Sequence, residues 1–429
     1  MNSEKNNTGF TVQHPQRALI RKKNISDILS RLSGSIYLPI LSILSALIIG
    51  GVVVIVSDNQ IIELWSNFFQ QPLKALSTSW FTVIETYKAL FSGSLGNPSE
   101  FFQAVFSGDS KLILRALDPL SETLLAATPL VFTGLAVALG FKAGVFNMGA
   151  EGQLFIGALF GTIVGVNFPF LPFFIHLPLS IIAGFLGGAL WGFIPGILKA
   201  KTGANEVIVT MMLNFVAYSL VEFFLTQPLI QRPDRNDPIS MMVLKSSVLP
   251  PLIRGLRVNW GFILALAAAV FVSWFLYKST KGYEVRMVGK NIRAAKYSGI
   301  KTSKTVVMTL CLSGGLAGLA GATEILGVTK CLSPGFSPGY GWDALAISVL
   351  GGLQPVGILF SSILFGALRA GSTPMQMSTG IPIDLITIIQ GFIIVFIAAP
   401  LLVKEIYRPG LLKKFAAGIF SRKEINNEN

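Results

Sequence analysis

Eight runs of consecutive apolar residues constrain this chain more than any other feature. Each is about 20 residues long, enough for a helix to cross roughly 30 Å of hydrocarbon. They lie at 37–57, 119–140, 152–170, 176–198, 206–226, 259–277, 304–325 and 384–402. The runs are continuous and show none of the alternation that marks a membrane β-barrel. The sequence therefore predicts an all-α, polytopic integral membrane protein.

Composition excludes the soluble classes of protein. Of the 429 residues, 52% are hydrophobic and 13% are charged, whereas a soluble domain has about 25% charged residues. A soluble enzyme, a nucleic-acid-binding protein and a disordered chain are all excluded by that balance. The net charge of +13 would suggest nucleic acid in a soluble protein, but here it reports which loops face the cytoplasm.

The distribution of Lys and Arg predicts the orientation. With the N-terminus in the cytoplasm, the inside segments hold 22 of these residues and the outside segments hold 10. Positive charge collects on the cytoplasmic side of spans. Both termini are therefore expected in the cytoplasm. Because residues 1–36 are polar and basic, we expect no cleavable signal peptide, and the run at 37–57 should act as the first anchor.

The apolar stretch 343–371 is interrupted at Gly351–Pro355. A single helix across it would place the basic C-terminal tail outside. A break restores a cytoplasmic tail, as two short spans or as one re-entrant hairpin, so we expect about ten crossings, or eight plus a hairpin. Irregular backbone at membrane depth must be buried in protein, and we expect this break near the centre of the bundle.

Five regions follow from these patterns. They are a basic cytoplasmic tail at 1–36, an anchor at 37–57, an extracellular excursion at 58–118, a transmembrane core at 119–402 and a second basic tail at 403–429. The excursion should lie on the membrane surface as one or two short helices.

No constellation for catalysis is recognisable. The chain lacks a phosphate-binding loop of the Walker A type. Its two cysteines, Cys311 and Cys331, and its two histidines are too few for a disulfide framework or a histidine-based metal site. We expect no catalytic residue, no metal and no cofactor.

Polar residues within the apolar runs are the candidates for a substrate pathway. Asn147 and Glu151 lie in a glycine-rich segment between two runs, Asn214 lies two turns into a run, and Glu324 follows a glycine-rich run. An ionisable group at membrane depth is a functional hypothesis. The alternative for Glu151 is a cap at the start of the next helix. Arg369 is expected to pair with an acid such as Asp384.

The inside loop 278–303 carries seven basic residues and one acidic residue. These charges serve as a topology signal. Apolar residues interleaved with them predict a short helix on the cytoplasmic face. Small residues such as Ala294, Ala295, Ser298 and Gly299 would let a partner protein approach closely.

Three segments together resemble a known family. They are Phe146–Gln153 (FNMGAEGQ), Thr202–Ile208 (TGANEVI) and Val288–Ile300 (VGKNIRAAKYSGI). The chain resembles the permease subunits of bacterial ABC importers in the ribose and branched-chain amino acid superfamily, over about 120–402. The first two segments resemble its nucleoside branch, which pairs with a lipoprotein of the basic-membrane-protein type.

The resemblance implies a plasma-membrane permease that moves nucleosides with a second permease subunit, a cytoplasmic ABC ATPase and a substrate-binding lipoprotein, and that binds no nucleic acid. It also implies that the ATPase docks on the inside loop. The expected docking residues are Gly289, Asn291, Arg293, Ala294, Ala295, Ser298 and Gly299. A permease for simple sugars remains an alternative. So does an ion-coupled carrier in which Glu151, Glu222 and Glu324 carry protons.

Overall fold

The structure is a computed structural model that describes residues 25–234 and 237–399. Within these ranges the regular structure is helical apart from two isolated β-bridges, which confirms the all-α prediction. Seven of the described helices are long and apolar enough to cross a membrane. The tail predicted at 403–429 and most of the tail predicted at 1–36 lie outside the described residues.

The described helices follow one another along the chain without an intervening sheet. Their bounds are α1 Ile25–Ser57, α2 Asn59–Ser66, α3 Pro72–Leu95, α4 Pro98–Ser107, α5 Ser110–Lys142, α6 Ala150–Asn167, α7 Phe173–Thr202, α8 Glu206–Leu225, α9 Trp260–Lys278, α10 Thr280–Lys290, α11 Ile292–Tyr297, α12 Thr302–Glu324, α13 Tyr340–Leu350, α14 Pro355–Thr379 and α15 Asp384–Ala398. A 3₁₀ turn, η1, covers Lys245–Ser247, and a π-helical turn, η2, covers Ile325–Thr329.

Each predicted apolar run coincides with one of these helices, but the expectation of one or two short helices on the membrane surface in 58–118 was wrong. It holds three helices and the start of α5, and α3 alone has 24 residues. Far from lying apart on a surface, α3 packs against α14 and α5. Thr123 on α5 donates a hydrogen bond to the Ser94 carbonyl at 2.6 Å. The excursion is thus part of the helical body.

The break at 351–354 is confirmed, but it does not lie near the centre of the bundle, as was predicted. Gly352 and Leu353 both have positive φ, 61° and 57°, which ends α13 and turns the chain into α14. The Tyr277 hydroxyl at the end of α9 donates to the Gln354 side-chain oxygen at 2.6 Å. The break therefore lies level with the end of a long helix and not at the bundle centre.

The backbones of α7 and α12 approach each other closely. A Cβ on Gly318 would lie 2.3 Å from the carbonyl oxygen of Gly184, and one on Gly314 would lie 2.3 Å from that of Gly188. Membrane helices gain contact where small residues let their backbones approach. The glycines of these two helices therefore act as packing surfaces.

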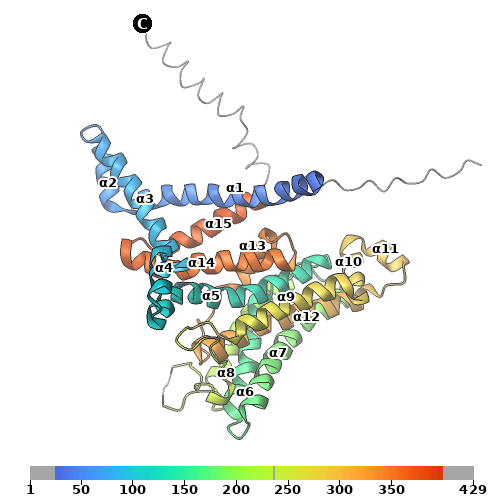
Figure 1. Cartoon of the computed structure of the whole chain (residues 1–429). Coiled ribbons are helices and arrows are strands. Elements are labelled where there is room, and N and C mark those ends of the chain that lie inside the picture. Colours follow the sequence, from blue (N-terminus) through green and yellow to red (C-terminus); the bar gives the residue numbers. More distant parts are fainter. Residues whose placement is uncertain (1–24, 235–236, 400–429) are drawn as a thin grey trace, which may run out of the picture.

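The two ends of the body differ. Figure 1 shows α10 and α11 together at one end, beside the ends of α5, α9 and α12, while α2, α3 and α4 lie at the other. The helices α6, α7 and α8 form one flank, and α1 with α15 forms the opposite flank.

Candidate substrate pathway and docking surface

Two helices begin inside the body, and both start beside the middle of longer helices. The segment before α6 reaches Ser313, halfway along α12, through a 2.7 Å hydrogen bond from the Asn147 amide. The segment before α13 reaches α5, where the Thr133 hydroxyl donates to the Tyr340 carbonyl at 3.2 Å. Irregular backbone at such depth is stable because protein surrounds it. The segment 143–149 thus runs from the end of α5, beside Gly289 of α10, inward to Ser313, and the segment 330–339 leads into α13 at the level of Thr133.

Both the nitrogen and the oxygen of the Asn147 side-chain amide form hydrogen bonds within the protein. Its nitrogen donates to the Gln153 side-chain oxygen at 2.8 Å as well as to Ser313. Its oxygen accepts from the backbone N–H of Gly149 at 3.0 Å. Ser313 in turn donates to the carbonyl of Ala136 on α5. The network joins α5, α6 and α12.

Asn214 fastens α8 to the start of α6. Its amide nitrogen donates to the Met148 carbonyl at 2.9 Å, and its oxygen accepts from the Gly152 N–H at 2.9 Å. The side chain is fully buried. The two bonds hold α8 against the start of α6. At the start of α8, Asn205 caps the helix by accepting from the Val207 N–H at 3.0 Å.

Glu151 joins α6 to α13. One carboxylate oxygen accepts from the Gly341 N–H at 2.5 Å, and the other accepts from the Ser337 hydroxyl at 2.6 Å. Gly341 is in the first turn of α13, and Glu151 is in the first turn of α6. Two helix N-termini, each carrying partial positive charge, therefore meet at one buried carboxylate. The sequence raised a capping role for Glu151 but not this partner helix.

Glu324 differs from these three residues. It is 6% exposed, and no hydrogen bond from the described residues reaches its side chain. It lines a cavity of about 700 Å³ at the end of the body where α3 and α4 lie. The structure therefore brings Asn147, Glu151 and Asn214 together as contacts between helices and places Glu324 on a cavity wall.

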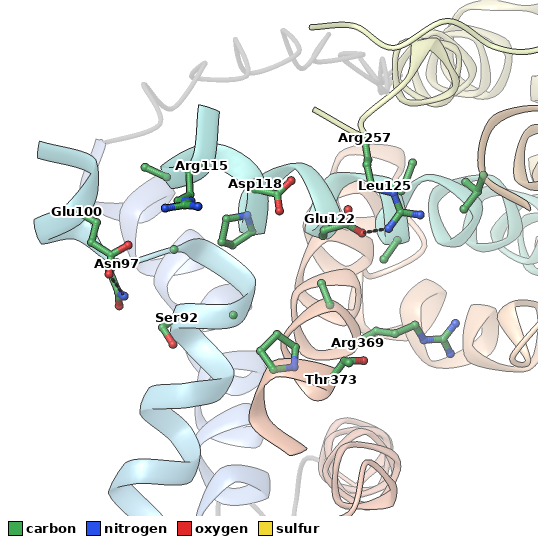
Figure 2. A pocket seen from close by; sticks show the side chains of 18 of the residues that line it. Ser92, Asn97, Glu100, Arg115, Asp118, Glu122, Leu125, Arg257, Arg369 and Thr373 are labelled. Carbon is green, nitrogen blue, oxygen red and sulfur yellow. Dashed lines mark hydrogen bonds and ion pairs between the residues drawn. The ribbon is translucent and has the colours of Figure 1, made fainter. Parts of the chain in front are cut away.

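The cavity is strongly charged. Figure 2 shows Arg115, Asp118 and Glu122 of α5, Glu100 of α4 and Arg369 of α14 around it. The lining residues that carry charge are Glu100, Arg115, Asp118, Glu122, Arg257, Glu324 and Arg369. Such a wall holds polar groups and water more readily than lipid chains.

Two ion pairs border this cavity. Arg257 pairs with Glu122 at 3.1 Å, and Arg369 pairs with Asp343 at 2.7 Å. The Arg369 guanidinium also lies 4.7 Å from the centre of the Tyr340 ring, a cation–π arrangement. The expected partner Asp384 was wrong, because Asp343 in the first turn of α13 is the acid that faces Arg369.

The predicted docking region contains two helices in place of one. Asn291 has extended backbone with φ −158°, and its side chain caps α11 by accepting from the N–H groups of Arg293 and Ala294. Ala295 is buried, and a Cβ on Gly289 would lie 2.2 Å from the carbonyl oxygen of Lys142. Apart from Ala295, the residues expected at the docking surface are exposed: Gly289, Asn291, Arg293, Ala294, Ser298 and Gly299.

Long apolar helices around a charged cavity, with broken helices inside the body, define a protein that moves polar solutes across a membrane. A family model described as "Branched-chain amino acid transport system / permease component" matches residues 120–398. The chain belongs to this permease family and is a multi-pass protein of the plasma membrane. It is a transport subunit and not itself an enzyme.

Three relatives illustrate the family. The guanosine ABC transporter permease protein NupP of Bacillus subtilis is 38% identical over 73% of this chain and 91% of its own length. The glucose ABC transporter permease protein TsgB13 of Haloferax volcanii is 37% identical over 68% and 79%. The nucleoside ABC transporter permease protein NupB of Lactococcus lactis is 33% identical over 66% and 80%. No solved structure matches the chain significantly.

Proposed function

We propose that this chain is one permease subunit of an ABC importer that moves nucleosides into the cell. The observation that carries the proposal is the similarity to permeases named for guanosine and for nucleosides, at 38% and 33% identity over two thirds or more of the chain. The glucose permease at 37% identity makes simple sugars the second candidate substrate.

We propose ten crossings with both termini in the cytoplasm, made by α1, α5, α6, α7, α8, α9, α12, α13, α14 and α15. The short helix α13 would cross together with the irregular segment 330–339 that precedes it. In this orientation α10 and α11 face the cytoplasm, and the charged cavity opens to the outside.

The relatives also indicate which subunits this permease assembles with. Bacillus subtilis and Lactococcus lactis each contribute two different permeases similar to this chain. We therefore propose a heterodimer of permeases, a cytoplasmic ABC ATPase on α10 and α11, and a binding lipoprotein at the outer end. The exposed face of α11, with Arg293 and Ala294, would receive the ATPase.

Within the permease, Glu324 would line the substrate pathway. Asn147, Glu151 and Asn214 would border that pathway by holding α6, α8 and α13, and they would meet substrate only where the helices separate during transport. Alanine at all four positions that left uptake unchanged in an assembled complex would contradict these assignments.

Uptake tests the substrate class. We expect a strain that lacks this permease to regain saturable uptake of labelled guanosine, uridine or adenosine when the gene is restored. Excess unlabelled nucleoside should compete, and glucose or ribose should not. Competition by sugars alone would replace the nucleoside assignment with the second candidate.

Docking has its own test. Ala294→Trp and Arg293→Glu alter an exposed surface, so the permease should still reach the membrane but co-purify with less ATPase. Glu222→Gln, on the exposed face of α8, is the matched control and should leave co-purification intact. Normal ATPase recovery with both α11 variants would exclude this surface as the docking site.

A further inference from the structure

Three polar groups near the outer cavity have no partner among the described residues. The Glu324 carboxylate accepts no hydrogen bond and is 6% exposed. The Nη1 atom of Arg369 and the Nδ2 atom of Asn259 are buried and also lack hydrogen-bond partners. Buried polar groups are nearly always paired in proteins, so each unpaired one calls for an explanation.

These groups surround two adjoining lobes. Glu324 and Arg369 line the cavity of about 700 Å³, and Asn259 lines a second cavity of about 750 Å³. The two share Leu125, Arg257 and Val328 as walls. Glu324 thus faces a space that is large enough for a small polar solute, whereas the unpaired N–H groups of Arg369 and Asn259 lie buried behind the walls of the two lobes.

The backbone at Glu324 is irregular in the same place. Glu324 ends α12, and the π-helical turn η2 follows it directly. That turn ends at Lys330, which has φ 58°, a left-handed conformation that is uncommon for a residue other than glycine. Single π turns and strained residues concentrate at functional sites. The irregular turn carries Gly327 and Val328, which also line the second lobe.

We propose that Glu324 accepts hydrogen bonds from two neighbouring hydroxyl groups of the substrate's sugar. The inference rests on the proposed function and names the part of the substrate that the permease contacts. A vicinal diol offers two O–H donors side by side, which match the two free oxygens of one carboxylate.

Recognition of the sugar accounts for the substrates named for these relatives better than recognition of the base does. The relatives are named for guanosine, for nucleosides and for glucose. Glucose has no base, whereas a vicinal diol is common to glucose and to ribonucleosides.

Proteoliposomes that hold the complete importer test the contact. Uptake of guanosine, 2′,3′-dideoxyguanosine and inosine is measured with the binding protein saturated by each, so that differences report the permease. We expect the wild-type importer to prefer guanosine over the dideoxynucleoside by about tenfold or more, the value of one or two hydrogen bonds to a charged group. In Glu324→Gln the preference should fall below about twofold, chiefly through slower guanosine uptake.

Two variants control for altered folding. Glu324→Asp keeps the carboxylate and should retain most of the preference, and Glu222→Gln makes the same substitution on the exposed face of α8 and should retain all of it. Co-purification of the second permease confirms assembly of each variant.

Other outcomes overturn the proposal. An equal loss of guanosine and dideoxyguanosine uptake in Glu324→Gln would show that Glu324 does not contact the diol. Loss of the preference for guanosine over inosine would move the contact to the base. A wild-type importer that moves glucose but no nucleoside would refute the proposed substrate, and glucose with its 3-deoxy derivative would then test the diol contact separately.

Discussion

Replacing Glu151 by alanine should loosen α13 at its first turn. The substitution removes the acceptor of the buried Gly341 N–H and of the Ser337 hydroxyl, 2.5 Å and 2.6 Å away. A buried donor without an acceptor costs about 1–3 kcal/mol, and the half-buried hydroxyl can turn toward water. We therefore expect the free energy of unfolding to fall by about 1–3 kcal/mol. Glu151→Gln keeps one acceptor and should lose about half as much.

Cys331 offers a local readout of this change. It lies in the segment 330–339 that precedes α13, is half-buried and is a free thiol. In a Cys311→Ser background, maleimide should modify Cys331 more than about tenfold faster in Glu151→Ala than with Glu151 intact. The reason is that the substitution lowers the free energy of local opening around Cys331. The apparent melting temperature of the purified permease should fall in parallel.

Glu206→Ala is the matched control. Glu206 is also in the first turn of a helix, and it pairs with Lys199 at 2.8 Å near the surface. This single, partly exposed pair should contribute less than the two buried bonds of Glu151, so the melting temperature should fall less than in Glu151→Ala. Unchanged Cys331 labelling and melting in Glu151→Ala would refute the view that this carboxylate holds α13.

Three further substitutions test the packing of the body. Gly318→Ala places a methyl group 2.3 Å from the Gly184 carbonyl oxygen and should abolish recovery of folded protein in size-exclusion chromatography, whereas Gly391→Ala, with nothing within 4 Å, should be recovered normally. Asn214→Leu leaves a buried carbonyl and N–H unpaired and should lower the free energy of unfolding by about 2–4 kcal/mol in a denaturant titration; a loss below about 0.5 kcal/mol would contradict the observed bonds. Asp343→Asn weakens a partly exposed ion pair and should lower the melting temperature less than Glu151→Ala does.

Local features of the sequence predicted much of the fold. Apolar length placed the long helices because each must satisfy its own backbone in lipid. Glu324 was singled out as a candidate for the substrate pathway because it is ionisable and follows a glycine-rich run, and the structure places it on a cavity wall.

Long-range contacts were beyond such reasoning. Glu151 meets Gly341, which is 190 residues away, and no local pattern marks that pair. Arg369 had more than one acid within reach along the chain, and only the turn at Gly352 and Leu353 decides that Asp343 faces it. The helix α3 was missed because charged residues such as Lys74 and Glu85 interrupt its apolar face.

The most direct test of the account is uptake of labelled guanosine, uridine and adenosine by cells that contain this permease with its partner subunits. Each measurement is paired with a substitution of the Walker A lysine in the ATPase partner. The account predicts saturable nucleoside uptake that disappears with that substitution. Uptake that survives it would indicate a gradient-driven carrier, and an intact complex that moves no nucleoside would contradict the proposed substrate.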